Sequence, residues 1–331
     1  MGTAEAAPAA LEEPLFIGVD VGGTKVAASV IGGGRAQQVV EHPTDLESGA
    51  RLLDGIEACV REVMSRKGAP AAIGVGVPSQ VEFSTGRVLA SVNIPLEGVP
   101  LREELGQRLG APVHVDNDGN CAALAEAHAV GARHLVMLTL GTGVGGGLVL
   151  DGSIYRGASG LGAELGHLVI EIDGPECPGN CPNRGCIEAL CSGLALERDA
   201  SELGRARPGS PLGRLVAEHG RVKGRDTVRL ARAGDADALA LLDEFGRRLG
   251  VAIAVVLNAF EPERVAIGGG LSGHADLFFQ TARREATARA LPMIVARSQV
   301  ELALTGAAAG VIGAGLLAAQ EHAANVAGVA A

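Results

Sequence analysis

The sequence predicts an α/β protein with two similar halves, because apolar runs typical of strands alternate with segments of helical periodicity. A polar, glycine-rich turn between two apolar strands occurs twice, at residues 20–25 and 141–147, about 120 residues apart. The two turns share little beyond their glycines, so the repeat is one of architecture and not of sequence.

The elements follow in order from periodicity. In the first half we predict strands at residues 15–19, 26–31, 71–77 and 113–115, and helices at 45–66 and 120–129. In the second half we predict strands at 134–140, 148–150 and 264–267, and helices at 236–260, 275–290 and 306–320. Residues 141–147 are predicted as a turn, and residues 170–191 as a loop rich in Cys, Pro and Gly.

Composition excludes several classes of protein. Hydrophobic residues make up 47% of the chain and charged residues 20%, enough apolar material for a packed core. The net charge is −10 with no Lys/Arg-rich block, which argues against a nucleic-acid surface. No apolar run reaches the ~18 residues of a membrane span. Residues 1–13 lack the basic start of a signal peptide and are expected to be a disordered lead-in, which favours a cytoplasmic protein with reduced cysteines.

The second glycine turn resembles several phosphate-binding motifs in part. Gly141, Gly143 and Gly146 satisfy G-x-G-x-x-G, but a dinucleotide fold needs a helix after the turn, and a strand is predicted here. The chain has no P-loop string and no protein-kinase signature. Five glycines within residues 141–147 exceed the needs of a hairpin, which favours backbone amides that bind phosphate. A pair of ordinary tight hairpins is the alternative.

Polar residues at both turns fit a nucleotide. Thr24 and Thr142 have hydroxyls that can donate to a phosphate oxygen, and Lys25 adds a positive charge. Asp20 precedes the first turn and can hold Mg²⁺ directly or through water.

Asn117 and Asp118 lie between a predicted strand and a predicted helix. An Asn or Asp at such a junction is most often a helix N-cap, but an Asp there can also take a proton from an attacking hydroxyl. The local string does not decide between the two roles.

A zinc site is predicted in the loop after residue 164. One imidazole and three thiols fall within 20 residues, namely His167, Cys177, Cys181 and Cys186. Disulfides or plain thiols are the alternative. Glu164 and Glu188 bracket the cluster, and a bound zinc would fix both carboxylates in space. The remaining cysteines, at 59, 121 and 191, are expected to be core residues.

Together these motifs resemble the ROK family (repressors, uncharacterised reading frames and sugar kinases) of the actin-like ATPase superfamily. The matching stretches occur in family order at residues 17–25, 117–118, 140–147, 164–167, 185–188 and 267–270. The resemblance implies two actin-like, ribonuclease H-like lobes with a cleft between them. The N-terminal lobe would comprise residues 14–117 together with a C-terminal helix at about 305–325. The C-terminal lobe would comprise residues 118–304 and carry the zinc loop at 167–188.

The resemblance also implies roles for individual residues. Asp118 would be the base that deprotonates the sugar 6-hydroxyl for attack on the γ-phosphate of ATP. The phosphate and adenosine contacts would come from Asp20, Gly22, Gly23, Thr24, Lys25, Gly141, Thr142, Gly143, Gly268, Gly269 and Gly270. The sugar would be bound by Asn93, Asn117, Asp118, Glu164, His167 and Glu188.

Two departures from the family pattern bear on these expectations. The family usually has C-x-C-G-x-x-G-C, whereas Cys177 and Cys181 are separated by three residues, so Cys177 is the less certain ligand. Residues 78–81, Pro-Ser-Gln-Val, replace a more Gly-rich turn beside the sugar.

The expected function is an ATP-dependent, glucokinase-type hexose kinase that uses ATP, Mg²⁺ and structural Zn²⁺. Kinases for fructose, mannose, N-acetylglucosamine or N-acetylmannosamine stay open, as does polyphosphate as donor. A non-catalytic sugar-sensing regulator is the other rival. Family repressors carry a DNA-binding domain ahead of the first turn, for which the 19 residues before Asp20 are too few. A homodimer is expected because dimers are common in the family, with no nucleic-acid or membrane partner.

Overall fold

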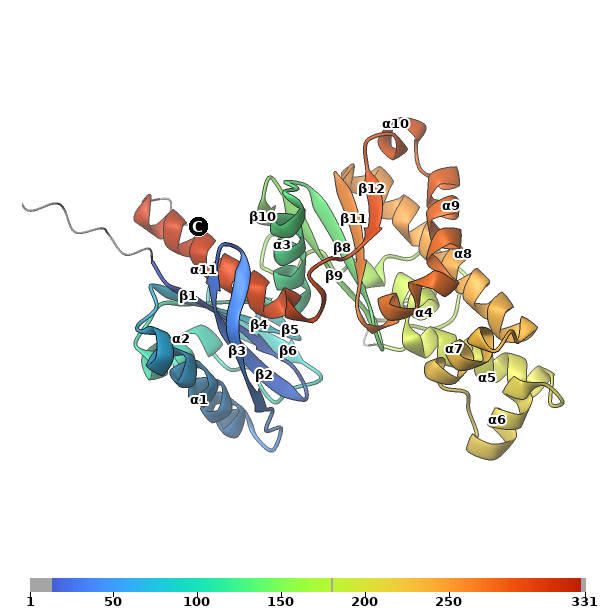
Figure 1. Ribbon diagram of the computed structural model, residues 1–331, viewed down its shortest axis with the longest axis horizontal. Coiled ribbons are helices and arrows are strands. Elements are labelled where there is room, and N and C mark those ends of the chain that lie inside the picture. The colour runs from blue at the N-terminus through green and yellow to red at the C-terminus, as the bar shows by residue number, and fades with distance from the viewer. Residues whose placement is uncertain (1–13, 180, 329–331) are drawn as a thin grey trace, which may run out of the picture.

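The computed structural model describes residues 14–179 and 181–328, and the expected lead-in at 1–13 lies outside them. Two five-stranded mixed sheets, each with its own hydrophobic core, lie side by side along the longest axis of the molecule (Figure 1). The α/β class predicted from the sequence is confirmed.

The first sheet has the strand order β3-β2-β1-β4-β7. Its strands are β1 (Phe16–Val21), β2 (Lys25–Gly32), β3 (Arg35–Pro43), β4 (Ala72–Val77) and β7 (Val113–Asn117). The first three strands pair antiparallel, and β4 and β7 run parallel to β1. A separate hairpin of β5 (Ser79–Glu82) and β6 (Arg87–Ser91) extends from the end of β4.

The second sheet repeats this topology in the order β10-β9-β8-β11-β12. Its strands are β8 (Leu135–Leu140), β9 (Val144–Leu150), β10 (Ser153–Ile154), β11 (Arg264–Gly268) and β12 (Gln299–Leu302). Here too the first three strands pair antiparallel and the last two run parallel to the first. The shared topology accounts for the two similar strand–turn–strand units in the sequence.

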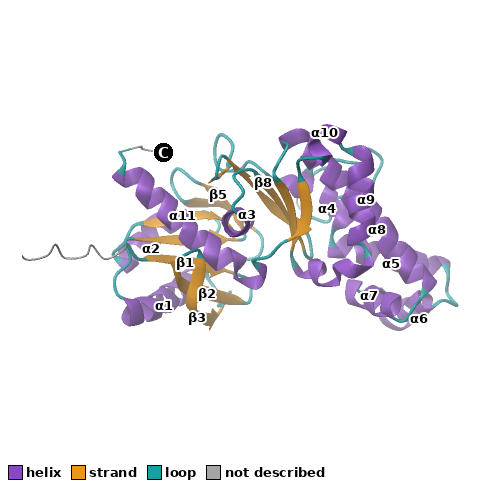
Figure 2. Cartoon of the chain, turned by 45° about the horizontal axis from the view of Figure 1, so that its top comes forward, coloured by secondary structure: helices purple, strands orange, loops and turns teal. Residues whose placement is uncertain are grey.

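Helices cover the outer faces of the sheets and fill the space between them (Figure 2). The first half contains α1 (Gly49–Lys67) and α2 (Leu101–Leu109). The second half contains α3 (Asp118–Val130), α4 (Ile187–Cys191), α5 (Gly193–Ala206), α6 (Pro211–His219), α7 (Gly224–Arg232), α8 (Ala236–Phe260), α9 (Phe279–Arg289) and α10 (Pro292–Val295). Three 3₁₀ segments are η1 (Leu165–His167), η2 (Gly270–Leu277) and η3 (Gly306–Ala308), and α11 (Ala309–Val326) returns the chain to the first sheet.

Glycines let α11 lie directly against the backbone of the first sheet. A Cβ on Gly74 in β4 would overlap the carbonyl oxygen of Ala314, and one on Gly18 in β1 would overlap that of Val311. On its other side α11 packs on α3, where a Cβ on Gly313 would overlap the Cys121 carbonyl. Backbones this close exclude any larger residue, so these glycines determine how α3, α11 and the first sheet stack.

The turn predicted at residues 141–147 is shorter than expected, because β9 begins at Val144. Gly145, Gly146 and Gly147 therefore belong to a strand. A Cβ on Gly147 would lie 2.6 Å from the carbonyl oxygen of Gly119, at the start of α3. At least one of the glycines that suggested phosphate binding, Gly147, therefore serves the close packing of α3 on β9.

Other boundaries also differ from those predicted. The strand at 113–115 extends to Asn117, α3 begins at Asp118, and the helix at 306–320 divides into η3 and α11. The predicted elements did not include β3, β5, β6, β10, β12, α2, α4–α7 or α10. The cysteines at 59, 121 and 191 are fully buried, as expected.

Across the part of the chain that the structure describes, no helix has both the length and the apolar character to cross a bilayer.

Replacement of Gly74 by Ala tests the close contact of α11. We expect Gly74→Ala to lower the free energy of unfolding by at least about 2 kcal/mol, because the new methyl group must displace the helix. Gly55→Ala in α1 is the matched control: its Cβ meets nothing within 4 Å, and a helical Gly→Ala change stabilises by about 0.5–1 kcal/mol. Urea unfolding measures both, and equal midpoints would contradict the proposed contact.

Candidate functional site

A cleft of about 910 Å³ opens between the two lobes and is lined by residues from both sheets. Ten of the residues predicted for the site line it: Asp20, Asn93, Asn117, Asp118, Gly141, Gly143, Glu164, His167, Glu188 and Gly269. Ten others do not, namely seven predicted phosphate or adenosine contacts and three predicted zinc ligands: Gly22, Gly23, Thr24, Lys25, Thr142, Gly268, Gly270, Cys177, Cys181 and Cys186. The cleft thus collects half of the candidates, although they come from distant parts of the sequence.

Asn117 and Asp118 stand where β7 passes into α3. The Asn117 side chain is the N-cap of α3, since its Oδ1 accepts from the N–H groups of Gly119 (2.8 Å) and Asn120 (3.3 Å). Its Nδ2 donates to the carbonyl of Ser79 at 3.3 Å, which ties the helix start to β5. Asp118 Oδ1 also accepts from Gly119 N–H, at 2.8 Å. The capping role therefore falls to Asn117, which leaves the second carboxylate oxygen of Asp118 free of any protein partner within the described residues.

Two carboxyl groups, those of Asp20 and Asp118, line the cleft near the ends of β1 and β7. Burial raises the pKa of Asp118 above its ordinary value, against a smaller lowering by the Gly119 N–H. The pKa of Asp20 rises to about 6, chiefly through burial and further through the charge of Asp118, while Lys25 opposes the rise. Gly310 at the start of α11 packs directly on the Asp20 carboxylate. Two close anions with little compensation favour a divalent cation or a proton between them.

The turn between β8 and β9 leaves backbone amides directed away from the sheet. Gly141 N–H donates to the Gly143 carbonyl at 2.9 Å, which closes the turn. The carbonyl oxygens of Gly141 and Thr142 accept from the N–H groups of Gly193 (2.8 Å) and Leu194 (3.2 Å), the first residues of α5. Within residues 14–179 and 181–328, nothing accepts from the N–H of Thr142 or Gly143. Gly143 lines the cleft and Thr142 precedes it, so these two amides can bind an anion there.

The first glycine turn lies outside the cleft lining. Gly22 N–H donates to the Lys25 carbonyl at 2.9 Å, and Thr44 Oγ1 donates to the Gly22 carbonyl at 2.6 Å. The Lys25 ammonium forms an exposed ion pair with Glu41. To contact a ligand in the cleft, the Lys25 ammonium would have to break its ion pair with Glu41. Breaking an exposed ion pair costs little free energy, about 0–1 kcal/mol.

The turn after β11 places only its middle glycine at the cleft. Gly269 has a positive φ of 84°, and a Cβ there would overlap Leu140 at the end of β8. Gly268 ends β11 and Gly270 begins η2.

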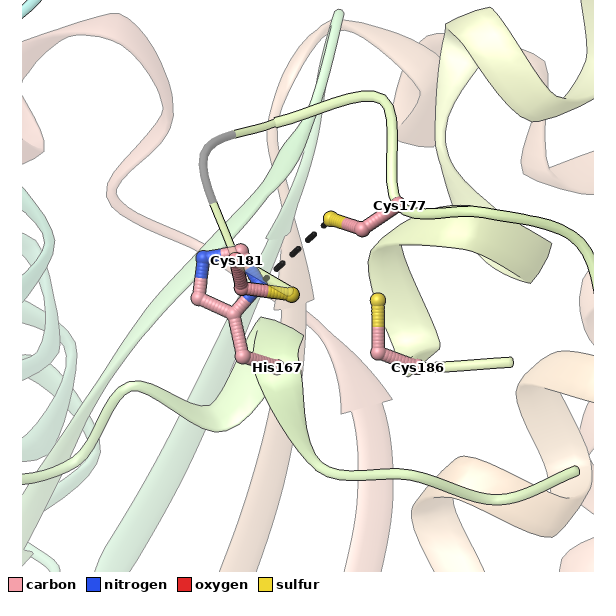
Figure 3. Close-up of side chains that lie close together, drawn as sticks. All are labelled: His167, Cys177, Cys181 and Cys186. Atoms are coloured by element: carbon pink, nitrogen blue, oxygen red, sulfur yellow. Dashed lines mark hydrogen bonds between the residues drawn. The ribbon is translucent and has the colours of Figure 1, made fainter. Parts of the chain in front are cut away.

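Figure 3 shows the four predicted metal ligands converging on one point. The ligand atoms of His167, Cys177, Cys181 and Cys186 all lie within 4.8 Å of one another. Cys177 Sγ is 3.8 Å from His167 Nδ1, close to the edge of a tetrahedron built on Zn–S and Zn–N bonds of about 2.3 and 2.1 Å. One imidazole and three thiols fit Zn²⁺, so this cluster can hold a metal ion.

Glu188 connects the Cys loop to the second glycine turn. Its Oε2 accepts from Val144 N–H at 2.9 Å, and its Oε1 accepts from Cys177 Sγ at 3.5 Å. A Cβ on Gly143 or on Gly179 would overlap this carboxylate, so a larger residue at either position would displace it. Glu188 therefore has one oxygen at the start of β9 and the other on the His/Cys cluster.

Several residues of the site were not predicted. Asp116 is 3% exposed and accepts from Arg156 Nε at 2.6 Å and from Asn120 Nδ2 at 2.8 Å, which holds β7 and α3 together. The hydroxyls of Ser79 and Ser91 are 2.8 Å apart, and Ser91 Oγ donates to the Ile94 carbonyl at 2.7 Å, so they fix the loop that carries Asn93. Arg156 lies 40 residues from Asp116, and Ser91 lies 12 residues from Ser79, so no local pattern indicates these two pairs.

The chain is similar to several known sugar kinases over most of its length. The chain is 35% identical over 316 residues to a glucokinase of Halalkalibacterium halodurans, covering 93% of this chain and 96% of the relative. The crystal structure of a ROK hexokinase from Thermus thermophilus matches with a TM-score of 0.79 and 36% identity, over 93% of this chain and 98% of the other. A ROK family glucokinase from Streptomyces griseus, in complex with glucose and AMPPNP, matches with a TM-score of 0.73 and 32% identity, over 92% and 99%.

The sequence profile described as the ROK family matches residues 16–321, nearly the whole described chain. The match includes both sheets, the cleft and the His/Cys cluster. The chain therefore belongs to the ROK family.

Proposed function

We propose that this chain transfers the γ-phosphate of ATP to the 6-hydroxyl of glucose, with Asp118 as the base. The chain is an ATP-dependent sugar kinase of the glucokinase type, as its similarity to glucokinases over most of its length supports. The observation that carries the more detailed proposal is the place of Asp118. Its buried carboxylate lines the same cleft as the 141–143 turn and as Glu164 and His167.

Asp118 suits the base role because its pKa is raised by burial. A base with a raised pKa takes the hydroxyl proton more readily during attack on the γ-phosphorus. The Asn117 cap and the Asp116 contacts hold this side chain at the end of a buried helix, so little reorganisation is needed. Phosphoryl transfer depends mainly on such positioning and on stabilisation of charge.

The donor side follows from the same geometry. The N–H groups of Thr142 and Gly143 can donate to phosphate oxygens, and Gly269 allows adenosine to approach the backbone. Asp20 would hold the Mg²⁺ that accompanies ATP, because its carboxylate lies near Asp118 with little compensating charge. Gly22, Gly23, Thr24 and Lys25 would contact the phosphates only after closure of the cleft, since they do not line it here.

The acceptor side would be formed by Asn93, Asn117, Glu164, His167 and Glu188. All five line the cleft beside Asp118. In this proposal the first lobe comprises residues 14–117 with the helix at about 305–325, and the second comprises residues 118–304. Closure of the two lobes on the sugar would exclude water that could hydrolyse ATP. The homodimer and the cytoplasmic location stay predictions.

A kinase for another hexose is the second candidate, because of Gln80. This exposed residue lines both the cleft and an adjoining cavity of about 80 Å³ that also contacts Asp118 and Glu164. A polar side chain there can favour a sugar with a different substituent.

A coupled ATP assay across a hexose panel tests both the substrate and the base. We expect the highest kcat/KM with glucose, and we expect Asp118→Asn to lower kcat by about 10²- to 10⁴-fold because the amide cannot accept the proton. Asp54→Asn, at a 68% exposed aspartate on α1, is the matched control and should leave kcat unchanged.

Calorimetric titration should show that Asp118→Asn still binds glucose and ADP. Turnover of this variant within a few-fold of the wild type would remove Asp118 from the base role. A higher kcat/KM with another hexose would contradict glucose as substrate, and no phosphorylation of any hexose would contradict the kinase itself.

Asp20 gives a prediction for stability. Its folded pKa of about 6 lies above its ordinary value of 3.8, so the folded state binds the proton more tightly. Proton binding by Asp20 therefore stabilises the folded state fully below pH 4. This contribution to the free energy of unfolding is lost as the pH rises through 6, and it amounts to at most about 3 kcal/mol. In metal-free urea unfolding, Asp20→Asn should therefore be more stable than the wild type at pH 7.5, with a smaller difference at pH 4. A difference that does not change with pH would contradict the assignment.

The His/Cys cluster is proposed to bind one structural Zn²⁺ through His167, Cys177, Cys181 and Cys186. Four protein ligands leave no open position for chemistry at the metal, so zinc would fix the loop that carries Glu164 and Glu188. Ligation of His167 through Nδ1 would leave Nε2 for the sugar side of the cleft.

Metal analysis of purified protein tests this site. We expect about one zinc per chain in the wild type and less than about half in Cys181→Ser, because a missing ligand weakens the site sharply. Cys59→Ser is the matched control, since this thiol is buried in the first lobe away from the cluster, and it should retain zinc. Less than half an equivalent in the wild type would count against the site.

A further inference from the structure

Glu126 is a fully buried carboxylate in α3, and it lies within salt-bridge distance of no Lys or Arg in the described chain. Its oxygens accept instead from the N–H of Leu304 (2.9 and 3.0 Å), the N–H of Thr305 (3.0 Å) and the Thr305 hydroxyl (2.9 Å). A buried charge is costly unless hydrogen bonds replace its water. All the side-chain hydrogen bonds that the structure gives this carboxylate come from one two-residue segment.

That segment is the connection from β12 in the second sheet to α11 on the first. It continues into Gly306, Ala307, Ala309 and Gly310, which line the cleft. Gly310 packs on the carboxylate of Asp20. Glu126 therefore anchors the beginning of a cleft wall whose far end meets the proposed magnesium ligand.

The other end of α3 is the reacting end. Asp118 is its first residue, and Glu126 lies eight residues further on, about 12 Å along the axis. The helix is buried along most of its length and packs on both β9 and α11. It thus joins the proposed base rigidly to the anchor of the 306–310 wall.

We propose that Glu126 is a positioning residue that sets the 306–310 wall against the reacting groups at the start of α3. The inference rests on the proposed kinase function and adds that this carboxylate determines how the nucleotide is held. Asn93, Glu164 and His167 lie on other segments, so sugar binding should be largely independent of Glu126.

Glu126→Gln tests this role. The amide replaces one carboxylate oxygen by an NH₂ group, which in either orientation faces at least one of the N–H groups of Leu304 and Thr305, donor against donor. We expect the KM for ATP and the dissociation constant for ADP to rise about 10-fold or more, the usual effect of an unpaired buried donor. The dissociation constant for glucose, measured by calorimetry without nucleotide, should not change.

Thr305 supplies a milder pair of variants in case Glu126→Gln does not fold. Thr305→Val removes only the hydroxyl donor and should weaken ADP binding by about 3-fold or more, whereas Thr305→Ser keeps the donor and should restore it. Asp243→Asn is the matched control: Asp243 accepts from the Thr281 hydroxyl at 2.7 Å, between α8 and α9 and away from the cleft. It should lower the melting temperature without an effect on ADP binding.

The outcomes separate the inference from the proposed function. Equal ADP binding by Thr305→Val and Thr305→Ser, or parallel losses of ADP and glucose binding in Glu126→Gln, would overturn the positioning role. If no hexose is phosphorylated by the wild type, the kinase proposal fails, and ADP titration alone still decides whether Glu126 positions the nucleotide wall.

Discussion

Direct contact between backbones, made possible by glycine, is the constraint on which the architecture depends. Gly18 and Gly74 admit α11 to the face of the first sheet, Gly313 brings it onto α3, and Gly147 brings α3 onto β9. A core with 2% aromatic residues has few large side chains to bridge wide gaps, so the elements approach closely instead. This stacking places the start of α3, and with it Asp118, between the two sheets.

The buried carboxylates around α3 are stabilised in different ways, and the difference distinguishes structure from chemistry. Asp116 is paired with Arg156 and amide donors, and Glu126 is satisfied by backbone and hydroxyl donors. Asp20 and Asp118 have far less compensation, and the pKa of each is raised. A protein tolerates such cost where a ligand supplies the missing charge, which is why uncompensated groups gather in the cleft.

Much of the fold could be predicted from the sequence, but only where periodicity is strong. The helix at 236–260 agrees with α8 because its apolar residues repeat at helical spacing, and β1 and β4 are short buried runs. In contrast, β3 exposes most of its residues and has no apolar alternation to reveal it. Most candidate site residues lie within short motifs. Asp116 and Glu126 contact residues 40 and 178 positions away, and such pairs depend on the completed fold.

Within residues 14–179 and 181–328, the chain passes between the sheets only at Asn117–Asp118 and at the segment before α11. Two crossings between two bodies define a line, as a pair of hinges defines the axis of a door. Atoms on that line move least when the bodies rotate. Asp118 lies at one crossing, so a rotation of the two bodies about this line would move the Asn93 loop and the 268–270 turn further than the carboxylate proposed as the base. In the proposed kinase, substrates would therefore enter and leave while the carboxylate proposed as the base keeps its place.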